Sequence, residues 1–470
     1  MGAETVNTGD GYSEGAQPQE TRMLKIIPLG GLGEIGLNMM VFEYEDAMFI
    51  VDAGLMFPED YMLGVDYVIP DMAYIRKNRS RVVGIVLTHG HEDHIGGLPF
   101  LLREINVPVY GTGFTLELVR HKLEEHGLID SVALHRIAPR DRLRIGPFEI
   151  EFIRVCHSVV DGVGLAIRTP VGLVVHTGDF KIDHTAANEM KTDVNGFAQC
   201  GEEGVLALLS DSTNVEKEGY TISSDDIGRT LSGVTAGRKG RIIVALFASN
   251  INRIQKIIDI AEKQQRKIVF NGRSIELSVR IAKALGYLNI RDDMEIDVTS
   301  LDEYQDEEVV MVMTGSQGEP MSALARMSTG SHKQIKIKKD DAVILSSKFI
   351  PGNEKAIANI INNLYRRGAD VIYEKISAIH VSGHAFQEEL KLMINLTKPK
   401  YFIPIHGEYR HLTLHGRLAR KAGIPQDNVI VAQNGQIIRF DKQTATLQSE
   451  VETGRLLVDG KGIGDVGRSV

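Results

Sequence analysis

The sequence has few cysteines, no tryptophan and no long hydrophobic segment. Its 470 residues include 2 Cys and no Trp. Cys156 and Cys200 are too few for a disulfide framework and lack the spacing of a zinc knuckle. We therefore expect a protein of the reducing cytoplasm. No apolar run in the sequence approaches the length that spans a bilayer, so we expect no membrane association.

An excess of basic residues is also missing. The formal net charge of −9 argues against a protein that holds nucleic acid through a broad basic surface. It does not exclude a nuclease, because a metal pair and local amides hold phosphate in a narrow channel. Residues 1–22 lack a basic start followed by an apolar stretch. We interpret them as a disordered leader and not as a signal peptide.

The rest of the chain has an ordinary globular composition, with 43% hydrophobic and 24% charged residues. Its length suggests two or three domains. From Met23, short strand-like runs alternate with turns and a few helices, which predicts a layered α/β domain. After Asp211, strands and helices alternate regularly, which predicts a parallel sheet with helices on both faces. Histidine-rich motifs then return at 378–390 and 401–405, so we expect one domain interrupted by an inserted second domain.

A cluster of metal-ligating residues follows the apolar strand predicted at Val82–Leu87. It contains His89, His91, Asp93 and His94. Nitrogen and oxygen ligands of this kind suit zinc or a similar divalent ion. The His-x-His spacing lets two imidazoles point the same way from an extended loop, and Asp93 with His94 can face a second metal. Three histidines in six positions make a helix cap with surface histidines the weaker interpretation.

Four residues cannot complete two metal sites, so further ligands must come from elsewhere. The candidates are His157, Asp179 and His406. Each follows a hydrophobic strand, where loop residues gather over one edge of a sheet. The sequence therefore predicts a two-metal hydrolase.

These motifs resemble known families. The His-x-His-x-Asp-His cluster, with Asp52 upstream and His157 and Asp179 downstream, resembles the metallo-β-lactamase superfamily. The motifs that contain Asp211, His384 and His406 resemble the β-CASP nucleases within it. Three further motifs narrow the resemblance to the ribonuclease J family, and they are Gly30–Gly36, Phe57–Asp60 and Ile350–Glu354. The resemblance runs from about Met23 to Gly467.

The resemblance implies an αββα sandwich with an inserted β-CASP domain. The expected boundaries are 23–212 and 374–450 for the two parts of the metallo-β-lactamase domain and 213–373 for the β-CASP domain. Residues 451–470 are expected to be a linker, because members of the usual length continue into a small C-terminal domain. That domain contributes to oligomer contacts in the family, and the implied assembly is a homodimer or a tetramer.

The resemblance also assigns the metal ligands. One ion takes His89, His91, His157 and Asp179. The other takes Asp93, His94, His406 and again Asp179, which bridges. The implied ions are two Zn²⁺, with Mn²⁺ as the alternative. Asp52 either orients a ligand histidine or is a strand-end turn residue.

Further roles concern the substrate. His384 fits a general acid or a transition-state stabiliser, and Asp211 would orient its ring. Ser249 and Asn250 resemble part of a pocket for a 5′-monophosphate, with helix capping as the alternative. The other residues proposed for phosphate contact are His380, Ser382, Gly383, His384 and Ala385. Phe57 either stacks on a base or belongs to the core.

The preferred function is a 5′→3′ exoribonuclease with some endonuclease activity in RNA processing and mRNA decay. Its substrate is single-stranded RNA with a 5′-monophosphate, and proteins of an RNA-degradation complex are potential partners. One alternative is a small-molecule hydrolase of the same superfamily, which would need neither the inserted domain nor His384. Another is a non-catalytic RNA-binding scaffold, whose signature would be lost metal ligands. DNA is a further possible substrate, but the ribonuclease J motifs argue against it.

Overall fold

The computed structural model describes residues 22–59, 62–183, 185, 191–316, 319, 321–347, 353–373, 382–460 and 462–463. His380 and part of the 350–354 motif lie outside these residues. Both cysteines are buried as free thiols. Within the described ranges, every helix is too short or too polar to cross a lipid bilayer.

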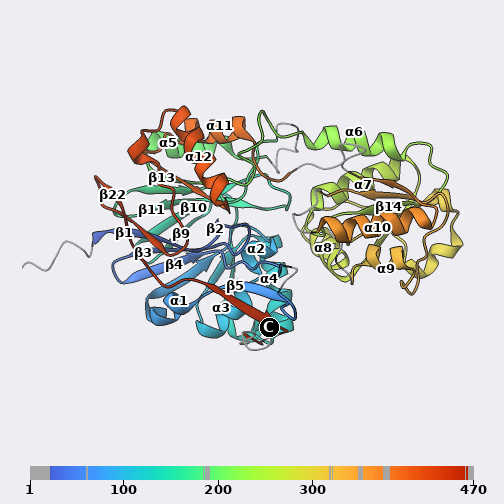
Figure 1. Ribbon diagram of the computed structural model, residues 1–470, viewed down its shortest axis with the longest axis horizontal. Coiled ribbons are helices and arrows are strands. Elements are labelled where there is room, and N and C mark those ends of the chain that lie inside the picture. The colour runs from blue at the N-terminus through green and yellow to red at the C-terminus, as the bar shows by residue number, and fades with distance from the viewer. Residues whose placement is uncertain are drawn as a thin grey trace, which may run out of the picture.

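The molecule has two lobes, which Figure 1 shows at left and right. The first lobe is built on two mixed sheets. One has the order β22 (Ala445–Glu450), β21 (Gln436–Phe440), β1 (Leu24–Gly30), β3 (Met39–Tyr44), β4 (Ala47–Val51), β6 (Val82–Val86), β7 (Val109–Gly111) and β8 (Leu134–Arg136). The other has the order β19 (Tyr401–Ile405), β13 (Val205–Asp211), β12 (Leu173–His176), β11 (Val163–Arg168), β10 (Phe148–Arg154) and β9 (Arg142–Ile145).

The two sheets pack face to face and are covered by helices on their outer faces (Figure 1). Phe42, Phe49, Phe148 and Phe152 belong to the core between the sheets and are fully buried. The helices beside the first sheet are α1 (Ala73–Lys77), α2 (Glu92–Ile95), α3 (Leu98–Glu104) and α4 (Gly113–His126). Those beside the second are α5 (Val194–Glu203), α11 (Gln387–Thr397) and α12 (Tyr409–Lys421). Strands with both faces buried are largely apolar, as observed for β19 and for residues 205–209 of β13.

The inserted lobe contains one parallel sheet with helices on both faces. Its order is β15 (Lys267–Asn271), β16 (Val309–Met313), β14 (Ile242–Ala245), β17 (Ala342–Leu345) and β18 (Asp370–Ile372). Its helices are α6 (Ser224–Thr235), α7 (Ile251–Lys263), α8 (Arg273–Ala284), α9 (Ala323–Thr329) and α10 (Glu354–Arg366). Ile242 and Val244 join one core cluster, whereas Ile243 and Ala245 join the other, as strand alternation requires. The predicted αββα sandwich with an inserted parallel α/β domain is confirmed.

Smaller elements complete the first lobe. β2 (Leu32–Gly33) pairs with β20 (Gly407–Glu408). β5 (Tyr67–Pro70) forms a three-stranded sheet with β23 (Arg455–Asp459) and β24 (Gly462–Ile463). Part of the segment expected to be a linker is therefore strand, and its Val458 is fully buried. Short 3-10 turns are η2 (Arg79–Arg81), η3 (Ile129–Ser131), η5 (Val298–Glu303), η6 (Asp306–Glu308) and η7 (Gln426–Asn428).

The strand order brings the expected ligands to one edge of the first lobe. β4 and β6 are parallel neighbours, and so are β12, β13 and β19. The carboxyl ends of parallel neighbours meet at the same edge, and Asp211 pairs in register with Ile405. Although the inserted lobe separates them in sequence, Asp211 and His406 are therefore spatial neighbours.

The inserted lobe also packs directly on the first lobe. Phe114 of α4, with Val159 and Val160, belongs to the core cluster that contains α7 and α8. The Phe114 ring lies 6.4 Å from the Tyr287 ring, measured between centroids. Since Val159 closely follows His157, this interface reaches the edge of the expected metal site.

The core of the first lobe contains a buried titratable group, His415 of α12. Its ring packs edge-on against Phe402, and its Nδ1 lies 3.0 Å from the Ser212 hydroxyl. Burial lowers the pKa of His415 to about 3, from an ordinary 6.5. The folded protein therefore keeps His415 neutral at pH values where the unfolded chain binds a proton.

We predict that this histidine makes folding sensitive to acid. Above pH 6.5 His415 is neutral in both the folded and the unfolded state and costs no stability. As the pH falls from 6.5 towards 3, only the unfolded chain binds the proton, and the free energy of unfolding decreases by about 1.4 kcal/mol for each pH unit. Denaturant unfolding at pH 6.5 and 4.5 should show a smaller loss of unfolding free energy in His415→Gln than in wild type. Exposed His135→Gln is the control, and equal acid losses in all three proteins would contradict the prediction.

Candidate metal centre

Three groups of potential ligand atoms meet at the edge where these strands end. In each group, the ligand atoms all lie within 4.8 Å of one another. The groups are His89, His91, His157 and Asp179; Asp93, His94, Asp179 and His406; and Asp179, Asp211, His384 and His406. The fold therefore brings together all nine residues that the sequence suggested for metal binding and acid catalysis.

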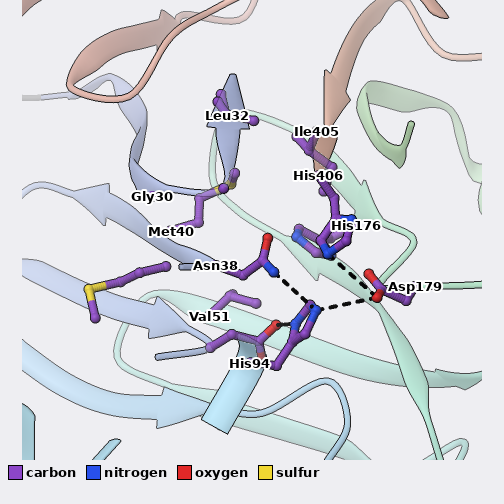
Figure 2. Close-up of a pocket in the computed structure, with 13 residues that line it drawn as sticks. Gly30, Leu32, Asn38, Met40, Val51, His94, His176, Asp179, Ile405 and His406 are labelled. Carbon is purple, nitrogen blue, oxygen red and sulfur yellow. Dashed lines mark hydrogen bonds and ion pairs between the residues drawn. The ribbon is translucent and has the colours of Figure 1, made fainter. Parts of the chain in front are cut away.

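The Asp179 carboxylate is the shared member of all three groups. Its Oδ2 lies 3.3 Å from Nε2 of His94 and 3.6 Å from Nε2 of His406 (Figure 2). The same oxygen lies 3.7 Å from Nε2 of both His89 and His157. One carboxylate oxygen at the middle of these imidazoles is the arrangement that a bridging ligand requires.

Each candidate ligand histidine has a partner for its other ring nitrogen. Nδ1 of His94 lies 2.7 Å from Asp52 Oδ2, so Asp52 contacts a ligand as the orienting role requires. The remaining pairs are His89 Nδ1 with Thr88 Oγ1 at 3.0 Å, His91 Nε2 with Ser158 Oγ at 3.3 Å, His157 Nδ1 with the Gly383 carbonyl at 2.8 Å, and His406 Nδ1 with Thr213 Oγ1 at 2.6 Å. Such outer partners fix the ring orientation and leave one nitrogen of each ring for a metal.

The backbone at the site is locally strained. Asp52 and His406 have φ values of 61° and 53°, in the left-handed region that non-glycine residues seldom occupy. Each lies directly after a strand, where the turn aims its side chain across the edge of the sheet. A Cβ atom at Gly54 would lie 1.7 Å from the Asp93 carbonyl oxygen. The chain beside Asp93 therefore requires glycine at position 54.

Burial and charge set the protonation of the ligands. Burial, with the neighbouring imidazoles, lowers the pKa of His91 to about 4 and holds the pKa of His89 well below its ordinary value. Burial also disfavours the charged form of Asp179, but the imidazoles of His406 and His94 outweigh it and keep its pKa low. Neutral imidazole and ionised carboxylate are the forms that bind metal.

Two of the candidate ligand histidines, His406 and His94, have raised pKa values instead. Burial opposes the charged form of His406, but the carboxylates around it outweigh burial and raise its pKa to about 9. The pKa of His94 is raised for the same reason. A cation bound here competes with these protons for the same nitrogens, so metal uptake is expected to release protons. Two sets of nitrogen and carboxylate donors with a shared oxygen fit two divalent cations.

A hydrogen-bonded pair of side chains, His384 and Asp211, lies beside the Asp179 carboxylate. His384 Nδ1 lies 2.8 Å from Asp211 Oδ2, while Oδ1 of Asp211 accepts hydrogen bonds from the Thr213 amide and hydroxyl. Asp211 is therefore fixed by Thr213 and in turn orients the His384 ring. Since Nδ1 of His384 donates to Asp211, its Nε2 is the nitrogen left for a substrate.

The residues expected to contact phosphate or a base, Asn250, Gly383 and Phe57, lie in three different environments. Asn250 caps α7, because its side-chain oxygen accepts from the Arg253 amide at 3.1 Å. Gly383 packs so closely on the His157 ring that a Cβ there would lie 2.6 Å from it. The Phe57 side chain is 61% exposed, beside the Tyr67 ring, so it does not belong to the core.

Several contacts were not predicted from the sequence. Thr88, Ser158 and Thr213 contact the rings of His89, His91 and His406, and the Asn38 amide donates to the Asp93 carbonyl at 3.0 Å. His176 also lines the pocket in Figure 2. Thr88 directly precedes His89 and Ser158 directly follows His157, and this adjacency is the only signal that the sequence offers for their roles.

The chain matches three family models. Residues 32–191 match the metallo-beta-lactamase superfamily, residues 239–364 match the beta-CASP domain of ribonuclease J, and residues 368–431 match the Zn-dependent metallo-hydrolase RNA specificity domain. These matches indicate binding of divalent metal and of RNA.

Curated relatives agree over nearly the whole chain. Ribonuclease J of Synechocystis sp. is 45% identical over 95% of this chain and 70% of its own length. Ribonuclease J of Thermus thermophilus is 46% identical over 96% of this chain and 80% of its own length. Ribonuclease J2 of Bacillus subtilis is 42% identical over 96% of this chain and 81% of its own length.

A solved structure supports the fold alone. It is a protein of unknown function from Enterococcus faecalis, with a TM-score of 0.62 and 16% identity, and the match covers 89% of this chain and 100% of that one. The alternatives of a small-molecule hydrolase and a non-catalytic scaffold are not favoured by the relatives. The chain belongs to the ribonuclease J family and is a metal-dependent ribonuclease.

Proposed function

We propose that this ribonuclease degrades single-stranded RNA from its 5′ end, prefers a 5′-monophosphate, and also cleaves internally. The observation that carries the proposal is the Asp211–His384 pair beside Asp179, with 2.8 Å between Oδ2 and Nδ1. This pair supplies a proton donor next to the metal ligands, as a phosphodiesterase needs. A homodimer or tetramer, partners in an RNA-degradation complex and a cytoplasmic location are further parts of this proposal.

We assign the metal ligands as the resemblance to ribonuclease J implies. One ion would be held by His89, His91, His157 and Asp179, and the other by Asp93, His94, His406 and Asp179. The many imidazole donors favour Zn²⁺, and the carboxylates also accept Mn²⁺. When bound, such a pair of ions supplies positive charge that stabilises the attacking and departing oxygens of a displacement at phosphorus.

His384 acts on the leaving group. Burial disfavours the charged imidazole, but the Asp211 carboxylate outweighs burial and raises the pKa of His384. The imidazolium is thereby available near neutral pH to donate its Nε2 proton to the departing 3′ oxygen. Asp211 keeps the ring in position before and after the transfer and stabilises its charged form.

The start of α7 is the proposed anchor for the 5′-phosphate. Amides at the first turn of a helix bind anions, and α7 has 13 residues. Asn250 caps this helix while Ser249 precedes it, and the buried Arg253 guanidinium adds positive charge in the first turn. Residues Ser382, Gly383, His384 and Ala385 complete the pocket in this proposal. Exposed Phe57 would stack on a base of the bound strand.

The assignment of Asp179 as a bridging ligand predicts different metal losses in two variants. Asp179→Asn should bind neither ion tightly, because both donor sets share its carboxylate. Asp52→Asn should keep both sites but weaken binding roughly 10–100-fold, because Asp52 belongs to neither donor set and contacts His94 and Thr88 behind them. Metal titration followed by elemental analysis measures both effects.

Asp427→Asn, at an exposed position, is the control for these two variants. Wild type and the control should bind two equivalents of metal. Retention of two tightly bound equivalents by Asp179→Asn would contradict the assignment.

The proposed 5′ anchor predicts a preference between RNA ends. Wild type should release mononucleotides faster from 5′-monophosphorylated than from 5′-triphosphorylated RNA of the same sequence. Ser249→Ala should reduce that ratio by roughly tenfold or more, since a hydrogen bond to a charged group contributes about 1.5–3 kcal/mol. Rates are measured with RNA labelled at either end.

Exposed Ser232→Ala in the same lobe and inactive His91→Ala are the controls for this experiment. Equal rates on both RNA ends in wild type would remove the anchor. Cleavage that survives His91→Ala would instead remove the metal mechanism.

A further inference from the structure

A buried carboxylate lies where the chain leaves and re-enters the first lobe. Glu389, in the first turn of α11, has no exposed surface. It accepts four hydrogen bonds: from the Ile182 amide at 2.9 Å, the Thr221 hydroxyl at 2.7 Å, the Thr221 amide at 3.0 Å and the Phe386 amide at 2.8 Å. Its two oxygens therefore each accept two bonds.

The donors belong to three segments, and each segment carries a residue of the proposed active site. Ile182 follows Asp179, and Phe386 follows His384. Thr221 lies between Asp211 and α6, on the segment that leads out to the inserted lobe. Glu389 thus joins the outgoing segment, the returning segment and the loop of the shared metal ligand.

Neighbouring contacts tie the same three segments together. The Ala385 amide donates to the Phe180 carbonyl at 2.7 Å, and the Gln387 side chain donates to the Val215 carbonyl at 2.9 Å. The Ser224 amide, at the start of α6, donates to Asp183 at 3.0 Å. Two segments cross between the lobes, one leading out to the inserted lobe through Thr221 and one returning through His384. The position of His384 relative to Asp179 therefore depends on how both of these crossing segments are attached to the first lobe.

Helix capping alone does not explain the four hydrogen bonds that Glu389 accepts. A glutamate at the third position of a helix often accepts from the amide that precedes the helix, and the Phe386 contact is of this kind. The other three donors come from outside the helix. A glutamine at this position has one acceptor oxygen and would turn its own amide protons towards donors.

We propose that Glu389 is a positioning residue of the ribonuclease reaction. Its carboxylate holds the loop of Asp179 and the loop of His384 in register, so that the proton donor stays aligned with the metal ligands. The inference rests on the proposed roles of Asp179 and His384. It assigns no contact between Glu389 and RNA, since the side chain is fully buried.

The first test is Glu389→Gln, which keeps the size of the side chain and removes its charge. A displacement of about 1 Å at a reacting group costs roughly 100-fold in rate. We expect kcat on 5′-monophosphorylated RNA to fall at least about tenfold, while KM and the number of bound metal ions stay unchanged. Glu308→Gln is the matched control, because Glu308 completes an exposed capping box in the inserted lobe. A tenfold loss of kcat in the control as well would overturn the specific role.

A double-mutant comparison separates positioning from general weakening of the fold. If Glu389 acts through His384, then Glu389→Gln should cost little further activity in a His384→Ala background. Fully multiplicative losses in the double variant would overturn the inference. If the wild type does not cleave RNA, the proposed function is wrong. If His384→Ala loses activity while Glu389→Gln is as active as wild type, only the role of Glu389 is wrong.

Thr221→Val keeps the test decisive if Glu389→Gln does not fold. It removes one donor to Glu389 and leaves the cap of α11 intact. We expect a smaller loss of kcat, again with unchanged KM and again absent in the His384→Ala background. Unchanged kcat in a folded Thr221→Val, or a loss that multiplies with that of His384→Ala, would contradict the role of the crossing segments.

Discussion

The burial of one carboxylate among imidazoles is the constraint on which the rest of the structure depends. Asp179 is 3% exposed, and its Oδ2 lies within 4 Å of five histidine rings. A charge removed from water in this way is unfavourable unless cations or hydrogen bonds compensate it. The surrounding histidines, and the divalent cations that they fit, supply this compensation.

That constraint explains why five strands of two sheets end at one place. Asp52, Thr88, Asp179, Asp211 and His406 all lie at or just beyond strand ends along a single edge. Ring nitrogens that face away from Asp179 each have an outer partner, which limits the freedom of every ligand. Because β13 and β19 flank the inserted lobe in sequence and pair in space, the active edge forms only when both crossing segments are in position. Glu389 lies at that junction.

The sequence alone predicts the layered fold, the inserted parallel sheet and the residues that meet at the centre. These features are predictable because three histidines in six positions and acidic residues after apolar runs are strong local signals. The roles of Thr213, Ser158 and Glu389 are not predictable from the sequence, because an outer partner is defined by its three-dimensional neighbour and not by spacing along the chain. Arg455–Asp459 was expected to be a linker, but its pairing with β5 depends on a strand far away in sequence. Asn250 remained ambiguous for a physical reason, since capping and phosphate binding use the same donors.

The shared role of Asp179 is tested most directly by a crystal structure of the metal-loaded protein, with anomalous scattering recorded at the metal absorption edge. We expect two anomalous peaks about 3.5–4 Å apart, as in other two-metal sites. One peak should be coordinated by His89, His91 and His157, the other by Asp93, His94 and His406, with Asp179 between them. A single peak, or a peak that Asp179 does not contact, would contradict the central claim that this carboxylate unites two metal sites.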